Sequence, residues 1–209
     1  MIAALVEVLV AYGLGSVSGS LLLGRLRGVD IRTRGSGNAG GTNALRTLGP
    51  WFALGVVIVD VGKGALAAGL VPGLLDPATP GWTAACGFAA VFGHCYPVWH
   101  GFRGGKGAAT AIGTLGAVAP WLLLPMFITW VLVLVLTGYV GLATVLAAAS
   151  LVPAAWLGGA ASAVLAYAVA LALFIAFTHR ANFQRLLAGT ENRFERARIT
   201  HWLGRRGSR

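Results

Sequence analysis

Residues 51–71, WFALGVVIVDVGKGALAAGLV, decide the class of protein to which this chain belongs. A helix needs about 20 mostly apolar residues to cross the hydrocarbon core of a bilayer, and this stretch has that length. Asp60 and Lys63 are three positions apart, so a helix places them on one face, close enough to pair. Charges inside a span are candidates for function. The pair predicts either a contact that fixes helix packing or a proton relay.

The composition of the whole chain supports the same class. Of its 209 residues, 57% are hydrophobic and only 11% are charged, and the mean hydropathy is +0.78. A soluble domain typically has about 25% charged residues. The net charge is +10. Because the chain is so apolar, this charge does not indicate a disordered protein or an ordinary nucleic-acid-binding module. We predict an all-α integral membrane protein that forms a single domain over residues 1–209.

Apolar runs of membrane length recur along the chain. The clear ones cover residues 2–24, 51–71, 82–99, 120–137, 139–157 and 161–178. A seventh run, residues 107–119, is short and rich in small residues. Apart from Lys63, every Lys and Arg follows the first run, precedes this short run, or lies in the C-terminal tail. Because bases accumulate on the cytoplasmic side, the pattern predicts about seven transmembrane helices, with the N-terminus outside and the C-terminus cytoplasmic.

The first polar segment, residues 34–46 (RGSGNAGGTNALR), places hydroxyl and amide side chains among glycines. Such a backbone can approach a ligand and point its amides at an anion. Arg46 adds a two-pronged donor suited to phosphate. The glycines fit a dinucleotide-binding pattern, but no strand precedes them and Asp60, the acidic residue at the right distance, lies inside a span. The alternative is a surface loop with scattered arginines.

The second polar segment is residues 93–110, GHCYPVWHGFRGGKGAAT. Its glycines bracket Lys106 at the start of the short apolar run, where the N-terminus of a helix favours an anion. A nucleotide-binding P-loop is excluded, because His100 and Gly107 stand where that motif needs Gly and Ser or Thr. His94 is a candidate base, and a structural histidine is the equal alternative.

The third polar segment, residues 179–193 (HRANFQRLLAGTENR), directly follows the last apolar run. His179 could accept a proton from a hydroxyl near neutral pH, and Asn182 could orient the substrate. The alternative is an interfacial helix whose arginines face lipid headgroups, which we favour from Arg196 onward. The three segments together predict glycine-rich cytoplasmic loops that form one pocket for phosphate-bearing ligands. The few, scattered carboxylates predict no metal site.

These segments resemble a known family. SGNAGGTNALR (36–46), GHCYPVWHGFRGGKGAAT (93–110) and HRANFQRLLAGTEN (179–192) are similar to the three motif regions of the bacterial acyl-phosphate:glycerol-3-phosphate acyltransferases. Asp60-Val-Gly-Lys63-Gly resembles the second span of that family. The resemblance implies a multi-pass enzyme of the bacterial inner membrane, with seven helices and a cytoplasmic active site, that uses no cofactor and binds no nucleic acid.

The resemblance also implies the reaction. The enzyme would move a fatty acyl group from acyl phosphate to the sn-1 hydroxyl of glycerol 3-phosphate, giving lysophosphatidic acid and inorganic phosphate, the first step of phospholipid biosynthesis. A soluble phosphate acyltransferase would supply the acyl phosphate. Positioning of the hydroxyl and stabilisation of charge would provide most of the acceleration. Either His179 or a phosphate oxygen of a substrate would take the hydroxyl proton.

The family's functional residues can be carried over to matching positions. The expected catalytic residues are Ser36, Arg46, Lys106, His179 and Asn182. The expected substrate contacts are Asn38, Thr42, Asn43, Gly104, Gly105, Gly107, Thr144, Arg185 and Glu191. Family members commonly carry serines after the tyrosine of the sixth span, where this chain has Gly141 and Thr144 after Tyr139. The role of that span is therefore left open.

Two further functions fit the bases and glycines. A transporter or channel for a phosphorylated metabolite would also need broken helices and anion sites. Such proteins usually contain repeated halves, and none of the motifs occurs twice in this sequence. A scaffold that holds anionic lipid would explain the basic face. It would not explain why Ser, Asn, Thr and His accompany the bases.

Overall fold

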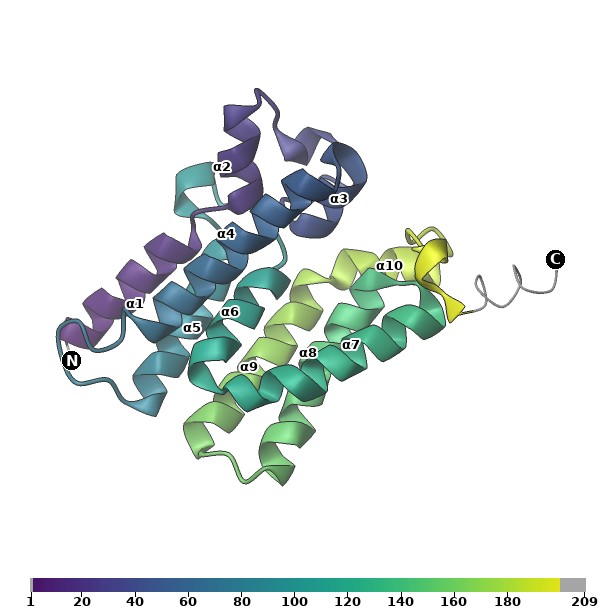
Figure 1. The fold of residues 1–209 in the computed structure, drawn as a ribbon. Helices are drawn as coiled ribbons and strands as arrows, with labels where there is room; N and C mark the ends of the chain where they lie inside the picture. Colours follow the sequence, from purple (N-terminus) through teal and green to yellow (C-terminus); the bar gives the residue numbers. More distant parts are fainter. Residues whose placement is uncertain (1, 200–209) are drawn as a thin grey trace. The chain divides into compact units, whose positions relative to one another are not determined.

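The computed structural model of this chain describes residues 2–199, in which the regular elements are all helices (Figure 1). Contacts between Cα atoms divide the chain into two compact units, Met1–Pro120 and Trp121–Arg209. Unit 1 holds the first two polar segments, and unit 2 holds the third. The single domain expected from the sequence stays a prediction.

Unit 1 is built around one long helix. Its helices are α1 (Ile2–Gly15), α2 (Gly19–Leu26), α3 (Gly41–Leu48), α4 (Pro50–Gly69), α5 (Pro80–Cys95) and α6 (Ala108–Val118), with the short 3-10 turns η1 (Ile31–Thr33) and η2 (Val98–His100). Helix α4 packs against all five other helices of the unit (Figure 1). It thereby connects the apolar helices with the polar loops.

Glycines allow the helices of unit 1 to approach closely. A Cβ atom built on Gly64 of α4 would overlap the carbonyl of Thr110, and one on Gly113 of α6 would overlap the carbonyl of Val61. Gly15 has the same relation to Ala90, across the contact between α1 and α5. Side chains at these positions would force the backbones apart, so the helix spacing depends on small residues.

The first expected span is not one continuous helix. It consists of α1 and α2, which are bent by 45° at a short break. At this break the carbonyl of Val17 and the amide of Gly19 bond to side chains of α4 and not to their own helix. The sequence predicted one apolar run over residues 2–24 but not this break, at which buried charges on a neighbouring helix satisfy the freed backbone groups.

Unit 2 comprises α7 (Leu123–Thr137), α8 (Val140–Leu157), α9 (Ser162–Thr178), α10 (Arg180–Leu187) and the 3-10 turn η4 (Glu195–Ala197); a further turn, η3 (Pro120–Leu122), precedes α7. Helix α8 packs against α7 and α9, and α10 contacts both α8 and α9 (Figure 1). Helices α9 and α10 are bent by 52° at His179. This bend places the third polar segment beside the start of α8.

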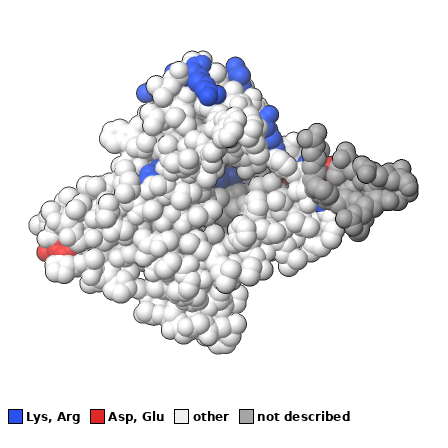
Figure 2. Space-filling model, in the orientation of Figure 1, with Lys and Arg blue, Asp and Glu red and all other residues white. Residues whose placement is uncertain are grey.

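Helix length supports part of the span count. Within residues 2–199, three stretches are long and apolar enough to cross a membrane by themselves, Pro50–Gly69, Pro120–Thr137 and Val140–Leu157, and the count rises to five if each bent pair is one span. Helix α6 is shorter, with 11 residues. The expected seven crossings and their orientation stay predictions. Exposed bases gather at the end of unit 1 where α2 and α3 lie (Figure 2).

Candidate active site

Asn43 organises the first glycine loop. Its buried side-chain amide donates to the backbone carbonyls of Ile31, Arg34 and Asn38 at 3.0–3.3 Å, and its Oδ1 accepts from the amide of Ser36 at 3.0 Å. Every polar atom of the side chain is therefore engaged by the loop. These contacts indicate that Asn43 shapes the loop, whereas the sequence predicted a contact with substrate.

The glycines of this loop are required by its geometry. Gly35 and Gly37 have φ angles of 57° and 71°, which favour glycine. A Cβ on Gly35 would also overlap Oδ1 of Asn43. The resulting turn leaves Ser36 exposed and Asn38 and Thr42 partly exposed ahead of α3, which carries the exposed Arg46. The loop is thus a rigid frame with polar groups at its surface.

The second loop is tied to the end of α5. The amides of Gly104 and Gly105 donate to the carbonyls of Cys95 and His94 at 3.1 Å. Side chains at either glycine would overlap the backbone or side chain of His94. Gly107 has a φ of 88° and is the N-cap of α6, so the partly exposed Lys106 lies at the N-terminus of that helix. This is the placement that the sequence predicted for Lys106.

The two loops are in contact within unit 1. A Cβ on Gly105 would come within 2.7 Å of the carbonyl of Ala39 in the first loop. Arg32 adds a second link, since Nη1 donates to the carbonyls of His100 at 3.2 Å and Arg103 at 3.4 Å. Arg32 is itself held by Asp30, at 2.7 Å. The sequence correctly placed these loops together, although it did not identify Arg32 or Ala39 as the link.

A buried cluster lies behind the loops. Lys63 Nζ is 2.9 Å from Asp60 Oδ1, which confirms the predicted pair, and 2.8 Å from Nδ1 of His94. All three side chains are buried, with at most 4% of each residue exposed. The participation of His94 was not predicted, because no local spacing joins residues on different helices.

In unit 2, His179 lies at the bend between α9 and α10. The residue is buried, and Nδ1 is 2.8 Å from the carbonyl of Ile175. A carbonyl only accepts, so Nδ1 carries the proton and Nε2 is the basic nitrogen of the ring. This arrangement suits His179 to accept a proton from a hydroxyl.

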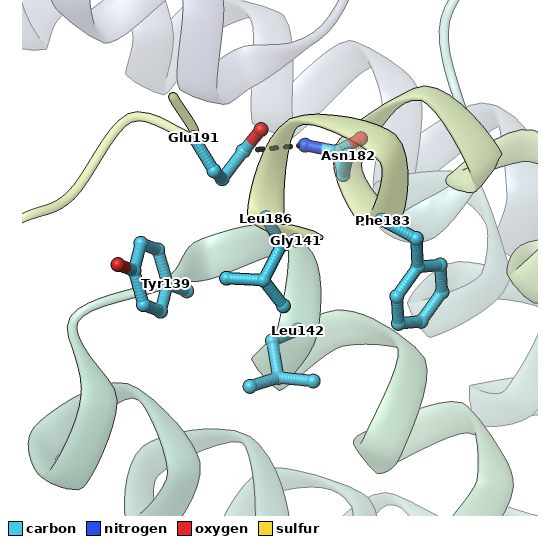
Figure 3. A pocket seen from close by; sticks show the side chains of 7 residues that line it. All are labelled: Tyr139, Gly141, Leu142, Asn182, Phe183, Leu186 and Glu191. Atoms are coloured by element: carbon cyan, nitrogen blue, oxygen red, sulfur yellow. Dashed lines mark hydrogen bonds between the residues drawn. The ribbon is translucent and has the colours of Figure 1, made fainter. Parts of the chain in front are cut away.

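Glu191 holds the neighbouring residues of the third segment. Its two oxygens accept from Asn182 Nδ2 and Arg185 Nε, each at 2.7 Å. A small pocket lies beside this network, where Figure 3 shows Asn182 and Glu191 facing each other. The pocket is lined by Tyr139, Gly141, Leu142, Asn182, Phe183, Leu186 and Glu191. Its lining combines the polar groups of Asn182 and Glu191 with apolar side chains.

The start of α8 contributes differently from the sequence-based expectation. Gly141 lies against Asn182, since a Cβ there would be 2.7 Å from Nδ2. The hydroxyl of Thr144 donates to the carbonyl of Val140 at 2.8 Å and is 3.3 Å from Nε1 of Trp130. Thr144 does not line the pocket described above. These contacts indicate a structural role for Thr144.

The predicted residues fall into two groups. Unit 1 contains the first loop, Arg46 and Lys106, and unit 2 contains His179, Asn182, Arg185 and Glu191. One pocket formed by all three segments stays a prediction. Among residues 2–199, no group of three or more His, Cys, Asp or Glu side chains is arranged to hold a metal ion.

Helices of membrane length with polar loops at their ends are typical of an integral membrane protein. Two solved structures of the same fold support this class, both of PlsY, an integral membrane glycerol 3-phosphate acyltransferase. Its glycerol 3-phosphate form matches with a TM-score of 0.83 and 39% identity, covering 91% of this chain and 95% of PlsY. Its lysophosphatidic acid form matches with a TM-score of 0.80 and 38% identity, covering 91% and 94%.

Sequence comparison identifies the family. The glycerol-3-phosphate acyltransferase family matches residues 5–189. A glycerol-3-phosphate acyltransferase of Symbiobacterium thermophilum is 44% identical over 186 residues, covering 88% of this chain and 92% of the relative. That of Aquifex aeolicus is 39% identical over 195 residues, covering 91% and 99%. The chain belongs to the glycerol-3-phosphate acyltransferase family, as its motifs predicted.

Proposed function

We propose that this protein transfers a fatty acyl group from acyl phosphate to the sn-1 hydroxyl of glycerol 3-phosphate, with lysophosphatidic acid and inorganic phosphate as products. The observation that carries the proposal is the match over 91% of the chain to PlsY in its glycerol 3-phosphate form. The two loops of unit 1 support a phosphate-bearing donor, because they combine Arg46 and Lys106 with glycine-rich backbone.

The reaction needs no covalent enzyme intermediate, because an acyl phosphate is already activated. The glycerol hydroxyl attacks the acyl carbonyl carbon, an ester C–O bond forms, and the bond from that carbon to the phosphate oxygen breaks. Lys106, at the N-terminus of α6, stabilises charge on the departing phosphate. The hydroxyl proton passes to Nε2 of His179 or to a phosphate oxygen. Asn182, held by Glu191, orients the acceptor.

We further propose that the enzyme lies in the bacterial inner membrane with its active site on the cytoplasmic side. The acceptor is soluble and the donor carries an acyl chain, so a site at the end of membrane-spanning helices gives both substrates access. A soluble phosphate acyltransferase would supply the donor from the same side. The basic end of unit 1 supports this placement, since bases accumulate on the cytoplasmic side (Figure 2).

The proposal is tested with purified protein in detergent. Acyl phosphate, acyl-CoA and acyl-carrier protein are compared as donors to glycerol 3-phosphate, and lysophosphatidic acid and phosphate are measured separately. We expect equal amounts of both products with acyl phosphate alone. Phosphate release without lysophosphatidic acid would contradict the proposal. Uptake of glycerol 3-phosphate into proteoliposomes without product would instead support the transporter alternative.

Substitution of the two proposed phosphate-binding bases tests the roles of the loops. Lys106→Ala and Arg46→Ala should each lower kcat/KM by about 100-fold or more, since each removes a charge-assisted contact to phosphate. Arg25→Ala is the matched control, because Arg25 is an exposed base of unit 1 outside the motifs. Unchanged kinetics in either loop variant would mean that the phosphate contacts are misassigned.

A further inference from the structure

The proposed reaction gives no role to the buried cluster of Asp60, Lys63 and His94. The three residues come from α4 and α5, and Asp60 is 0%, Lys63 4% and His94 2% exposed. Removing charges from water is costly, so such a group persists only with well-made contacts. The contacts of this cluster connect it to the second glycine loop and to the break in the first span.

The hydrogen bonds of Lys63 determine the protonation of His94. The ammonium group has three N–H donors. They are directed to Oδ1 of Asp60 at 2.9 Å, to the carbonyl of Val17 at 2.6 Å and to Nδ1 of His94 at 2.8 Å. With the Lys63 ammonium as the donor, Nδ1 of His94 is an acceptor and the ring proton lies on Nε2; Nδ1 is farther from Oδ1 of Asp60, at 3.5 Å. With one nitrogen engaged and the other protonated, His94 is unsuited to act as a base.

The opposite side of the His94 ring faces the second loop. A Cβ built on Gly105 would overlap Nε2 and would also lie 2.7 Å from the carbonyl of Ala39. The backbone carbonyl of His94 accepts from the amide of Gly105 at 3.1 Å. The backbone carbonyl of His94 thus holds Gly105, and its ring leaves no room for a side chain at that position. Lys106 is the next residue, so its position depends on this contact.

The same cluster also fixes the break between α1 and α2. Besides the bond from Lys63 to Val17, Oδ1 of Asp60 accepts from the amide of Gly19 at 3.0 Å. The loop of residues 96–102 is in turn attached to α1, since Tyr12 donates to the carbonyl of Tyr96 at 2.8 Å and Trp99 donates to that of Gly13 at 2.9 Å. The cluster therefore holds the break, and the second loop is bonded both to His94 of the cluster and to α1.

We propose that Asp60, Lys63 and His94 form a positioning triad that holds the Gly104–Gly107 loop in its phosphate-binding shape. The proposal rests on the proposed function of that loop. It assigns His94 a neutral ring with the proton on Nε2. A proton relay would instead require Lys63 or His94 to release its proton during turnover, which the complete set of Lys63 contacts opposes.

The tautomer of His94 is measured first, in the wild-type protein. Protein labelled with 15N-histidine in detergent gives separate signals for protonated and unprotonated ring nitrogens, and His94→Gln identifies the signals of His94. We expect a protonated Nε2 and an unprotonated Nδ1. A proton on Nδ1, or on both nitrogens, would overturn the proposal. This measurement does not depend on turnover, so it separates failure of the triad from failure of the proposed reaction.

The kinetic test uses variants that keep or remove parts of the triad. His94→Gln keeps an N–H donor on the side of Gly105 and should retain activity within about 10-fold, whereas loss of a general base costs about 100- to 10,000-fold. The double variant Asp60→Asn/Lys63→Met leaves no uncompensated buried charge, so it should stay folded. We expect it to raise the KM for acyl phosphate about 10-fold or more.

The matched control is Gly62→Ala, on the same helix, where a new Cβ meets no atom within 4 Å. It should leave both kcat and KM unchanged. A double variant with wild-type KM for acyl phosphate would overturn the positioning role. A His94→Gln variant with the full loss expected for a base would do the same. If the wild type does not turn over with any donor, the proposed reaction fails. The measured tautomer of His94 then tests the triad by itself.

Discussion

His179 shows how one backbone contact can prepare a side chain for chemistry. The carbonyl of Ile175 holds the proton on Nδ1 and so keeps Nε2 basic. We predict that His179→Asn, which can keep a donor toward Ile175, lowers kcat about 100-fold or more while the KM for glycerol 3-phosphate changes little. Steady-state kinetics with varied glycerol 3-phosphate measure this. If the variant keeps most of its kcat, a phosphate oxygen of a substrate is the base.

Asp30 provides a prediction on pH dependence. The side-chain hydrogen bond from Arg32 holds the pKa of Asp30 below its usual range. The ion pair therefore stabilises the folded state fully above the ordinary Asp pKa of about 4. This stabilisation is lost as the pH falls through the lowered pKa of Asp30 in the folded protein. Because the pair is partly exposed, we expect wild type to melt only about 1–3 °C above Asp30→Asn at pH 7. This difference should shrink below about pH 4, and a difference that grows on acidification would contradict the assignment.

At the scale of elements, Gly141 allows α8 to approach α10. A Cβ at this position would be 2.7–3.0 Å from three atoms of Asn182. We predict that Gly141→Ser displaces Asn182 from Glu191 and lowers kcat/KM about 10-fold, even though it introduces a residue common in the family. The control is Gly116→Ala, where a Cβ meets no atom within 4 Å. Activity equal to wild type in Gly141→Ser would show that Asn182 does not need this contact.

The elements that the sequence predicted best are those whose signal is local. The run at residues 51–71 corresponds to α4, and the run at 139–157 corresponds to α8, because apolar length alone defines such helices. The break near Val17 was missed because its partners lie on α4. Only the small residues around it, Gly15, Ser16, Ser18 and Gly19, marked it in the sequence.

The candidate site was predictable in composition but not in contacts. Glycines and bases identified both loops of unit 1, because a phosphate-binding loop needs these residue types wherever it lies in the fold. The separate roles of Asn43 and His94 depend on partners elsewhere in the fold. Asn43 satisfies four backbone groups of its loop, and His94 meets Lys63 on another helix. Sequence spacing carries no information on such pairings.

For the whole molecule, the distribution of bases predicts the number and orientation of membrane crossings, which helix length alone does not determine. Seven crossings put the loops after the first and third spans, and the segment after the last span, in the cytoplasm. They put the connections near Asp76 and Gly159 outside. Single cysteines at Asp76, Gly159, Arg34 and Gly189, all exposed positions, can test this in intact cells with a membrane-impermeant maleimide.

We expect labelling at positions 76 and 159 and none at 34 and 189 until the cells are opened. The native cysteines, Cys86 and Cys95, are buried and should stay unlabelled in the parent protein, which serves as the control. External labelling at 189 with protection at 34 would indicate an odd number of crossings between them. The helix of residues 108–118 would then not cross the membrane, and the third segment would lie on the opposite side from the two loops of unit 1. The proposed single cytoplasmic site requires the first result.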